Sequence, residues 1–214
     1  KQGAGTPLAH PCHRLDRETS GVVLCAKTKP VESSLKTQFM HGQINKWYLA
    51  IVSGKPPHQF DMRFPLALQG ERGLVHIRMV NDPEGLPSET LAQRIAWDPK
   101  TNRSLILCEP KTGRQHQIRV HLAELGFPIV GDKLYEMGDA YFDAFTKGTP
   151  EVENIPLAHE RHALHAWQIA FRLESGQSNA VAPIPEDFQL LLSQPVFEEA
   201  EAALSKLTIS PIDC

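Results

Sequence analysis

The chain has 214 residues, 41% of them hydrophobic, and a formal net charge of −3. This length and apolar content allow one large domain with a sizeable core, and the net charge excludes a generally basic nucleic-acid-binding protein. The four cysteines form no CxxC pair, which excludes zinc-ribbon and thioredoxin-type sites and suits a reducing compartment. With no signal peptide or membrane-length apolar stretch in the sequence, we expect a cytoplasmic protein without a membrane partner.

The first notable stretch, after a loop over residues 1–12, is His13-Arg-Leu-Asp-Arg-Glu-Thr-Ser-Gly21. Its Thr-Ser-Gly end predicts a turn, and the apolar run over 22–26 predicts a buried strand that places Cys25 in the core. Asp16 would then lie on a loop held against a strand, which is a common place for a catalytic group. On local sequence alone, a surface salt bridge of Asp16 with Arg14 or Arg17 is the stronger interpretation.

The next elements indicate a sheet. A helix is predicted over 31–41, ended by Gly42, and a strand over 46–52. On that strand Tyr48 is either a half-buried strand tyrosine or a ring presented at the edge of a site. Further strand-like runs are separated by short turns and cover residues 59–68, 74–80, 88–97 and 104–110. Short connections between successive strands favour a mostly antiparallel sheet.

A second notable stretch is Lys111-Thr-Gly-Arg-Gln-His-Gln-Ile-Arg-Val-His-Leu122. Strand and helix periodicities compete in it, but Gly126 and Pro128 form a helix-stop signal. We predict a helix over about 115–125, with Gln115, Arg119 and Leu122 on one side. Residues 100–120 carry a net charge of +4, so this region is compatible with a basic, RNA-binding surface.

The C-terminal part is less periodic at first. Residues 133–160 are predicted to form a long surface loop with room for one helical turn at 139–146. A strand follows over 163–171, then a turn over 175–178 and an edge strand over 180–183. An acidic helix is predicted over about 186–206, in a region (181–214) with a net charge of −5. We therefore expect one domain over residues 1–214.

Cofactor and metal motifs are missing from the sequence. The ten histidines include three close pairs, but none forms HExxH or carries a nearby acid at a recurrent ligand spacing. No GxGxxG, GxxxxGK[ST] or GxSxG occurs, which argues against nucleotide cofactors and serine hydrolases. We expect neither a metal nor a cofactor.

Taken together, HRLDRETSG (13–21), KWYLA (46–50), TGRQHQIRVHL (112–122) and LHA (164–166) resemble the RluA-type RNA pseudouridine synthases. GFPIVGD (126–132) and Leu134-Tyr135 match in order and spacing as well. The family usually has an upstream strand before the first motif, so we expect the N-terminal part of the catalytic domain to be missing. The glycine that often follows Leu134-Tyr135 is Glu136 here.

The resemblance implies an α+β fold, in which helices and loops flank a mixed, largely antiparallel central sheet around a catalytic cleft. It implies that uridine in RNA is isomerised to pseudouridine without a cofactor, with Asp16 as the catalytic carboxylate and Tyr48 as the active-site tyrosine. Arg119 would pair with Asp16 through a bidentate fork that fixes the carboxylate's orientation. Because the target base must leave its stack, Arg14 is expected to fill the vacated space.

The expected partner is a structured ribosomal or transfer RNA, bound by a monomer. Besides Arg14, the residues expected to contact RNA are Arg17, Arg103, Lys111, Arg114 and His116. His13, His116 and His121 also suit structural hydrogen bonds. Two alternatives remain open from sequence: a catalytically silent RNA-binding module on the same fold, and an N-glycosidase that cuts the same bond without re-forming it.

Overall fold

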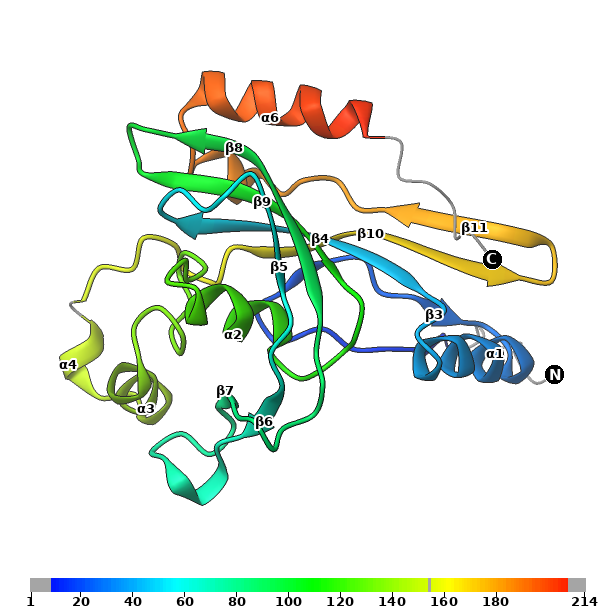
Figure 1. Cartoon of the computed structure of the whole chain (residues 1–214), viewed down its shortest axis with the longest axis horizontal. Coiled ribbons are helices and arrows are strands. Elements are labelled where there is room, and N and C mark those ends of the chain that lie inside the picture. Colours follow the sequence, from blue (N-terminus) through cyan, green and yellow to red (C-terminus); the bar gives the residue numbers. More distant parts are fainter. Residues whose placement is uncertain (1–8, 154, 208–214) are drawn as a thin grey trace, which may run out of the picture.

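The structure is a computed structural model that describes residues 9–153 and 155–207. A curved seven-stranded sheet runs through it (Figure 1). The strand order is β11-β10-β4-β9-β8-β5, with β2 pairing alongside β10. The strands are β2 (Ser20–Gly21), β4 (Asn45–Ser53), β5 (Gln59–Met62), β8 (Thr90–Asp98), β9 (Arg103–Pro110), β10 (Leu164–Leu173) and β11 (Gly176–Val181). The β2–β10 pair is parallel and the other pairs are antiparallel, so the predicted α+β fold is confirmed.

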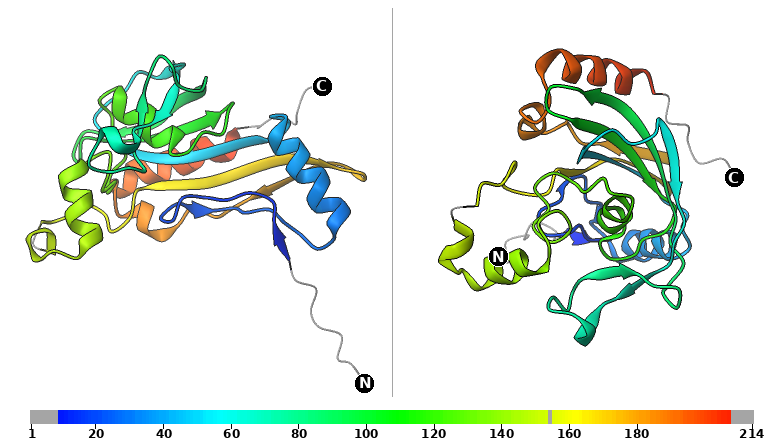
Figure 2. Two further views of the ribbon diagram at one scale, coloured as in Figure 1. Left: turned by 90° about the horizontal axis from the view of Figure 1, so that it is seen from below. Right: turned by 60° about the vertical axis from the view of Figure 1, so that its left-hand side comes forward.

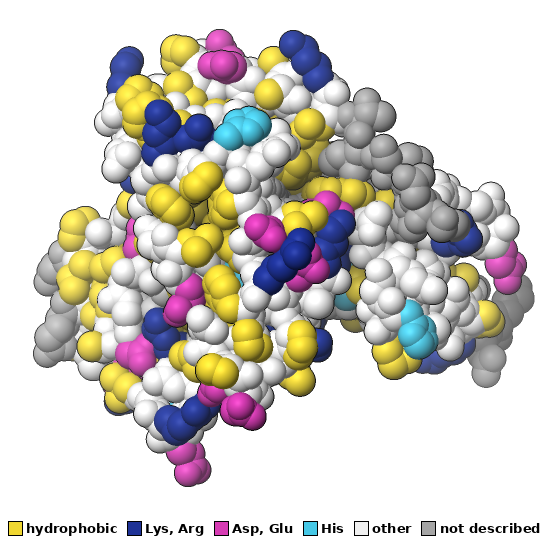
Figure 3. All heavy atoms as spheres, in the orientation of Figure 1, with side chains coloured by type: hydrophobic (Ala, Val, Ile, Leu, Met, Phe, Trp, Pro, Cys, Tyr) yellow, Lys and Arg dark blue, Asp and Glu magenta, His cyan; other side chains and the backbone are white. Residues whose placement is uncertain are grey.

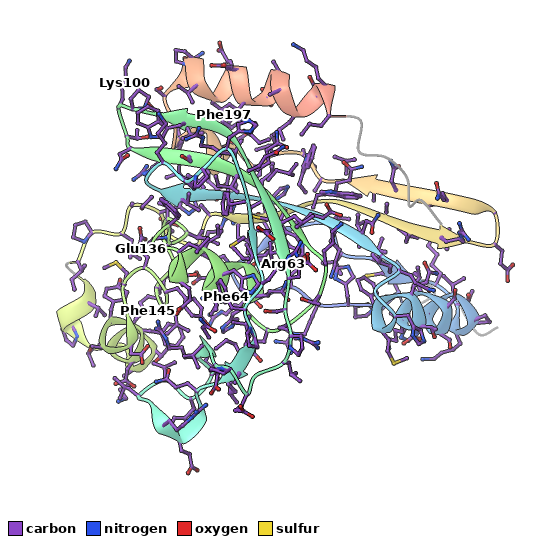
Figure 4. The ribbon with its side chains drawn as sticks, viewed as in Figure 1. Arg63, Phe64, Lys100, Glu136, Phe145 and Phe197 are labelled. Carbon is purple, nitrogen blue, oxygen red and sulfur yellow. The ribbon has the colours of Figure 1, made fainter. Side chains whose placement is uncertain are left out.

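The two faces of the sheet have different covers. Along β4, Tyr48 and Ala50 lie opposite Cys108 and Ile106 of β9, on the face covered by α2 (Gln117–Glu124) and the loop that precedes β2. Helices α5 (Glu186–Gln189) and α6 (Gln194–Lys206) cover the other face (Figure 2). Phe197 of α6 packs into the core there, beside β8 (Figure 4).

Smaller elements surround the sheet. At one end, β1 (His10–Pro11) pairs with β3 (Cys25–Ala26) beside α1 (Lys29–Met40). An arm formed by β6 (Leu66–Leu68) and β7 (Met79–Asn81), with a short 3₁₀ helix between them (Gly70–Arg72), extends from the edge of the molecule. In the residues that the structure describes, no helix combines the length and apolar character needed to cross a bilayer.

The prediction of a buried strand over 22–26 is wrong. Only Cys25 and Ala26 pair as a strand, and Cys25 is exposed. The chain pairs with β10 earlier, at β2, where a Cβ on Gly21 would lie 2.1 Å from the carbonyl oxygen of Ala166. Since Gly21 also has φ +116°, glycine is required at this close approach, and the chain turns away from the sheet after it.

Other boundaries also differ. The helical turn predicted at 139–146 is confirmed as α3 (Asp139–Lys147). The rest of 133–160 is not one surface loop, because it also contains α4 (Pro150–Glu153) and begins with buried Leu134 and Tyr135. The predicted helix over 186–206 is divided into α5 and α6. The predicted turn at 175–178 is already strand β11 from Gly176 onward. Over 59–68 and 74–80, only β5, β6 and the start of β7 are strands.

Candidate active site

A pocket of about 300 Å³ opens on the face of the sheet that carries Tyr48. Its walls come from residues 12–19 of the loop before β2, from β4 and from the segment that leads into α2. Six of the nine predicted site residues line it: Arg14, Asp16, Tyr48, Arg114, His116 and Arg119. The three motifs, which are far apart in sequence, therefore meet at one site.

The loop that carries Asp16 is fixed by hydrogen bonds within the loop and to residues in and just before β10. The backbone N–H of Thr19 donates to the Asp16 carbonyl at 3.0 Å, and the Thr19 hydroxyl lies 2.7 Å from Nε2 of His162. Ser20 Oγ lies 2.9 Å from Nδ1 of His165. At the start of the motif, Nε2 of His13 accepts the N–H of Leu24 at 2.9 Å, as the structural role predicted for it requires.

Arg119 of α2 contacts Asp16, as the resemblance implied, but the geometry differs from the expected fork. Its Nη1 lies 3.1 Å from Oδ2 of Asp16, a single contact. The bidentate fork is made to Asp132, with Nε 2.7 Å from Oδ2 and Nη2 2.9 Å from Oδ1. Asp132 is fully buried and also accepts the backbone N–H groups of Leu134 and Tyr135, both at 3.0 Å. Asp132 therefore orients the guanidinium, and the guanidinium presents its remaining nitrogen to Asp16.

The electrostatics of this cluster keep its buried members charged. Burial opposes the charged form of Arg119, but hydrogen bonds to Asp132 and the charges of Asp132 and Asp16 outweigh it and raise the pKa of Arg119. Burial likewise works against the carboxylate of Asp132, while Arg119 lowers the pKa of Asp132. Sequence reasoning did not assign Asp132 a role, although it lies in a segment that matches the family. Its function depends on a contact that only the fold creates.

Tyr48 projects from β4 next to an irregularity in the sheet. The register of β10 against β4 shifts between Ala166, opposite Tyr48, and Gln168, and such bulges often occur beside active sites, where they re-aim side chains. Burial, and then the charge of Asp16, raise the pKa of Tyr48 to about 12. The phenol is therefore protonated at neutral pH, where it can stack on a base and donate a hydrogen bond.

His116 closes the pocket at the start of α2. Its backbone is left-handed, with φ 53°, and a right-handed helix cannot include such a residue. The helix therefore begins at Gln117 and not at the predicted residue 115, so Gln115 lies outside it. Nδ1 of His116 lies 3.0 Å from the hydroxyl of Tyr135. Burial, together with the charge of Arg119, lowers the pKa of His116 to about 4. The imidazole is neutral at pH 7, so any contact it makes with RNA is a hydrogen bond and not an ion pair.

The other three predicted RNA-contacting residues lie outside the pocket. Arg17 is exposed on the same loop as Asp16, and Lys111 forms an ion pair with Glu109. Arg103 is at the far end of β9 from the pocket, where its Nη1 donates to the carbonyl of Leu191 near α5. The structure thus does not bring Arg103 to the site.

The net positive segment over 100–120 does not form a single basic surface. In the space-filling view, lysine and arginine side chains near the middle of this face are interleaved with carboxylates (Figure 3). Within the segment, Lys111 forms an ion pair with Glu109, and outside it Arg63 forms ion pairs with Asp61 and Glu89.

His121, on the buried side of α2, connects this helix to Ser88 and Thr90. It is fully buried, with Nε2 2.8 Å from the Ser88 hydroxyl and Nδ1 3.0 Å from the Thr90 hydroxyl, and its ring lies edge-on to that of Phe64. Gln117 fixes the preceding loop by accepting the N–H of Arg114 at 2.9 Å. Across the described residues, no three metal-ligating side chains gather in one place.

The chain is similar to known proteins over most of its length. A family model described as RNA pseudouridylate synthase matches residues 1–124. Ribosomal large subunit pseudouridine synthase D from Zymomonas mobilis is 35% identical over 181 residues, covering 84% of this chain and 54% of that protein. An RNA pseudouridine synthase of Helicobacter pylori, itself named as uncharacterized, is 36% identical over 185 residues, covering 86% and 60%.

A solved structure shares the fold. The structure of human RNA Pseudouridylate Synthase Domain Containing 1 superposes with a TM-score of 0.70 at 25% identity, covering 97% of this chain and 83% of the human one. The present chain spans 60% of the length of the Helicobacter protein and 54% of the Zymomonas protein.

Proposed function

Because the chain belongs to the RNA pseudouridylate synthase family, we propose that it converts specific uridines in structured RNA, ribosomal or transfer, to pseudouridine. The observation that carries the proposal is the ion-paired cluster of Asp16, Arg119 and Asp132 at the wall of the pocket. A carboxylate that acts on an RNA base has to be held in place. The contact with Arg119 holds Asp16, which keeps one open side, since its side chain is 24% exposed.

The pocket residues suit three separate tasks. Asp16 is the catalytic carboxylate for breaking the N1–C1′ bond of the flipped uridine before the C5–C1′ bond forms. Tyr48 stacks on the uracil, and its raised pKa favours a role as hydrogen-bond donor over removal of the C5 proton by a phenolate. Arg14, exposed and only two residues before Asp16, fills the space that the uridine leaves in the RNA stack.

Two other activities are compatible with the fold. A silent RNA-binding module would not need the buried Asp132 to hold Arg119 against Asp16, because a desolvated ion pair is costly to maintain. An N-glycosidase would use the same carboxylate but would need water to reach C1′. The presence of the complete cluster favours the isomerase over the silent module.

The experiment that tests the proposal is a map of pseudouridine in ribosomal and transfer RNA from cells with and without this protein. We expect at least one uridine to be modified only when the protein is present. Re-expression of the wild-type protein should restore that site, and re-expression of the Asp16→Asn variant should not. Identical maps in both cells would contradict the proposed function.

A further inference from the structure

Lys46 brings a cation into the pocket that the proposed chemistry does not use. It lies two residues before Tyr48 on β4, so the two side chains project from the same face of the sheet. Both line the pocket together with Asp16. The Lys46 ammonium group therefore lies beside the place proposed for the substrate uridine.

This ammonium group has few partners. Its Nζ lies 3.5 Å from the carbonyl oxygen of Thr112, which is beyond the usual range of a hydrogen bond. Within the described part of the chain, no carboxylate is within ion-pair distance of it, and the single carboxylate lining the pocket, Asp16, is paired with Arg119. Burial lowers the pKa of Lys46, so the protein bears a desolvation cost there that no internal partner offsets.

Gly113 leaves the ammonium open to the pocket. A Cβ at this position would meet only Nζ of Lys46, at 3.7 Å. No left-handed φ requires glycine here, so the lack of a side chain at residue 113 has the effect of keeping Lys46 accessible. Access and an unpaired charge together indicate a ligand from outside the protein.

The charge of the pocket indicates which kind of ligand. Arg14 and Arg114 line it as well, and neither has a carboxylate partner among the described residues. Arg114 instead donates to the carbonyl of Pro87 at 3.1 Å. We propose that Lys46 binds a backbone phosphate next to the flipped uridine, so that the pocket recognises a nucleotide within an RNA chain. This inference rests on the proposed function and extends it to the substrate's phosphodiester.

A phosphate fits these observations better than a uracil carbonyl. Lysine binds phosphate as a compact point charge, and an anion repays the desolvation of the ammonium more fully than a neutral oxygen does. A residue that contacts phosphate gives a salt-dependent contribution to binding, because each contact releases counterions from the RNA. A residue that contacts the base does not.

The test measures binding of a ten-nucleotide oligouridylate at several salt concentrations. This single-stranded probe presents uridines and phosphates without requiring the natural target. For Lys46→Met, we expect about fivefold weaker binding at low salt and a salt slope smaller by about 0.7. Lys46→Arg should keep the wild-type slope. Gly113→Val, which keeps the charge but covers Nζ, should also reduce the slope.

The matched control is Lys55→Met. Lys55 lies beyond the other end of β4, with Nζ 3.8 Å from the centre of the Trp97 ring, and it does not line the pocket. Its replacement should leave the slope unchanged. An unchanged slope in Lys46→Met, or an equal loss in Lys55→Met, would overturn the phosphate site. Because pseudouridine formation by the wild-type protein is measured separately, failure of this inference is distinguishable from failure of the proposed function.

Discussion

Two three-membered charge clusters in this protein have opposite arrangements. In the pocket, buried Arg119 lies between two carboxylates, those of Asp16 and Asp132. On α1, Glu32 lies between two lysines, with Nζ of Lys29 at 2.9 Å and Nζ of Lys36 at 2.7 Å. Both clusters have short contacts and a buried central side chain, since Arg119 is 8% and Glu32 10% exposed. Their outer partners differ: the carboxylates of Asp132 and Asp16 are 0% and 24% exposed, whereas the two lysines are 78% and 53% exposed.

The difference shows why contact distance alone does not identify a functional ion pair. Around Arg119 the cost of desolvation is high, so the cluster persists only with complete pairing and oriented hydrogen bonds. Around Glu32 water solvates both lysines, and such pairs contribute little to stability. We expect the two clusters to respond very differently to substitution.

The largest effect is expected for Asp16→Asn. This change removes the carboxylate that we propose to be catalytic but keeps its size, so pseudouridine formation in a single turnover should be abolished. RNA affinity should stay within about tenfold of the wild-type value, or roughly 1.4 kcal/mol, because the substitution does not touch the residues proposed to contact phosphate. Quantifying pseudouridine by mass spectrometry alongside an RNA-binding titration checks both parts. A large loss of affinity would mean that Asp16 is structural.

A smaller but still large effect is expected for Asp132→Asn. The neutral amide cannot form the bidentate ion pair with Arg119, and this loss should lower the free energy of unfolding by about 3–5 kcal/mol. Because Arg119 then no longer holds Asp16 in position, the single-turnover rate should fall about 100-fold. Asp139→Asn is the control, because Asp139 forms an equally short pair with Arg78 at 2.6 Å, where both side chains are about one-quarter exposed. If Asp132→Asn and Asp139→Asn lowered the stability and the rate equally, the buried ion pair in the pocket would be no more important than the partly exposed one.

A third prediction concerns a buried group that the protein keeps neutral. Burial lowers the pKa of His121 from 6.5 to about 4, so between these values the unfolded chain binds a proton that the folded protein does not. Stability should be unaffected by this group above pH 6.5 and should fall by about 1.4 kcal/mol per pH unit below it, until about pH 4. Urea unfolding at pH 6.5, 5.5 and 4.5 measures this dependence.

The variant His121→Gln isolates the contribution of this residue. Glutamine can keep a hydrogen bond to Ser88 or Thr90 but does not titrate. The free energy of unfolding should therefore depend less steeply on pH, by the contribution of one proton. His41→Gln, a change at an exposed residue just after α1, is the control and should keep the wild-type pH dependence. The same pH dependence in all three proteins would show that His121 does not carry it.

The smallest effect is expected for Glu32→Gln. Hydrogen bonds from Lys36 and Lys29 lower the pKa of Glu32 to about 2, so its contribution is present above pH 4.5 and is lost as the pH falls toward 2. Because the lysines are exposed, the melting temperature at pH 7 should change by no more than about 2 °C, and turnover should be unaffected. A change as large as that in Asp132→Asn would contradict the comparison.

The cluster around Arg119 also shows which contacts of the site can be predicted from the sequence. The Asp16–Arg119 contact joins residues 103 positions apart and was expected from the motifs that carry them. The fork to Asp132 was not expected, because nothing in its local sequence distinguishes an aspartate that holds an arginine from one that ends a turn. The contact depends on how α2 packs against the segment after Ile129.

Local patterns failed where tertiary contacts override them. The apolar run after Gly21 reads as a strand, but the close approach of Gly21 to Ala166 directs the chain away from the sheet. Residues 133–160 read as a loop because their periodicity is weak, yet Leu134 and Tyr135 anchor the segment in the core. Arg103 reads as part of a basic surface, but the direction of β9 carries it away from the pocket.

The most direct test of the central claim is tritium release from RNA labelled at C5 of uridine. Isomerisation replaces the C5–H bond with C5–C1′, so the wild-type protein should release tritium in the same amount as it forms pseudouridine, without free uracil. Absence of release from ribosomal and transfer RNA transcripts would contradict the isomerase and support a silent RNA-binding module. Free uracil among the products would contradict it in favour of an N-glycosidase.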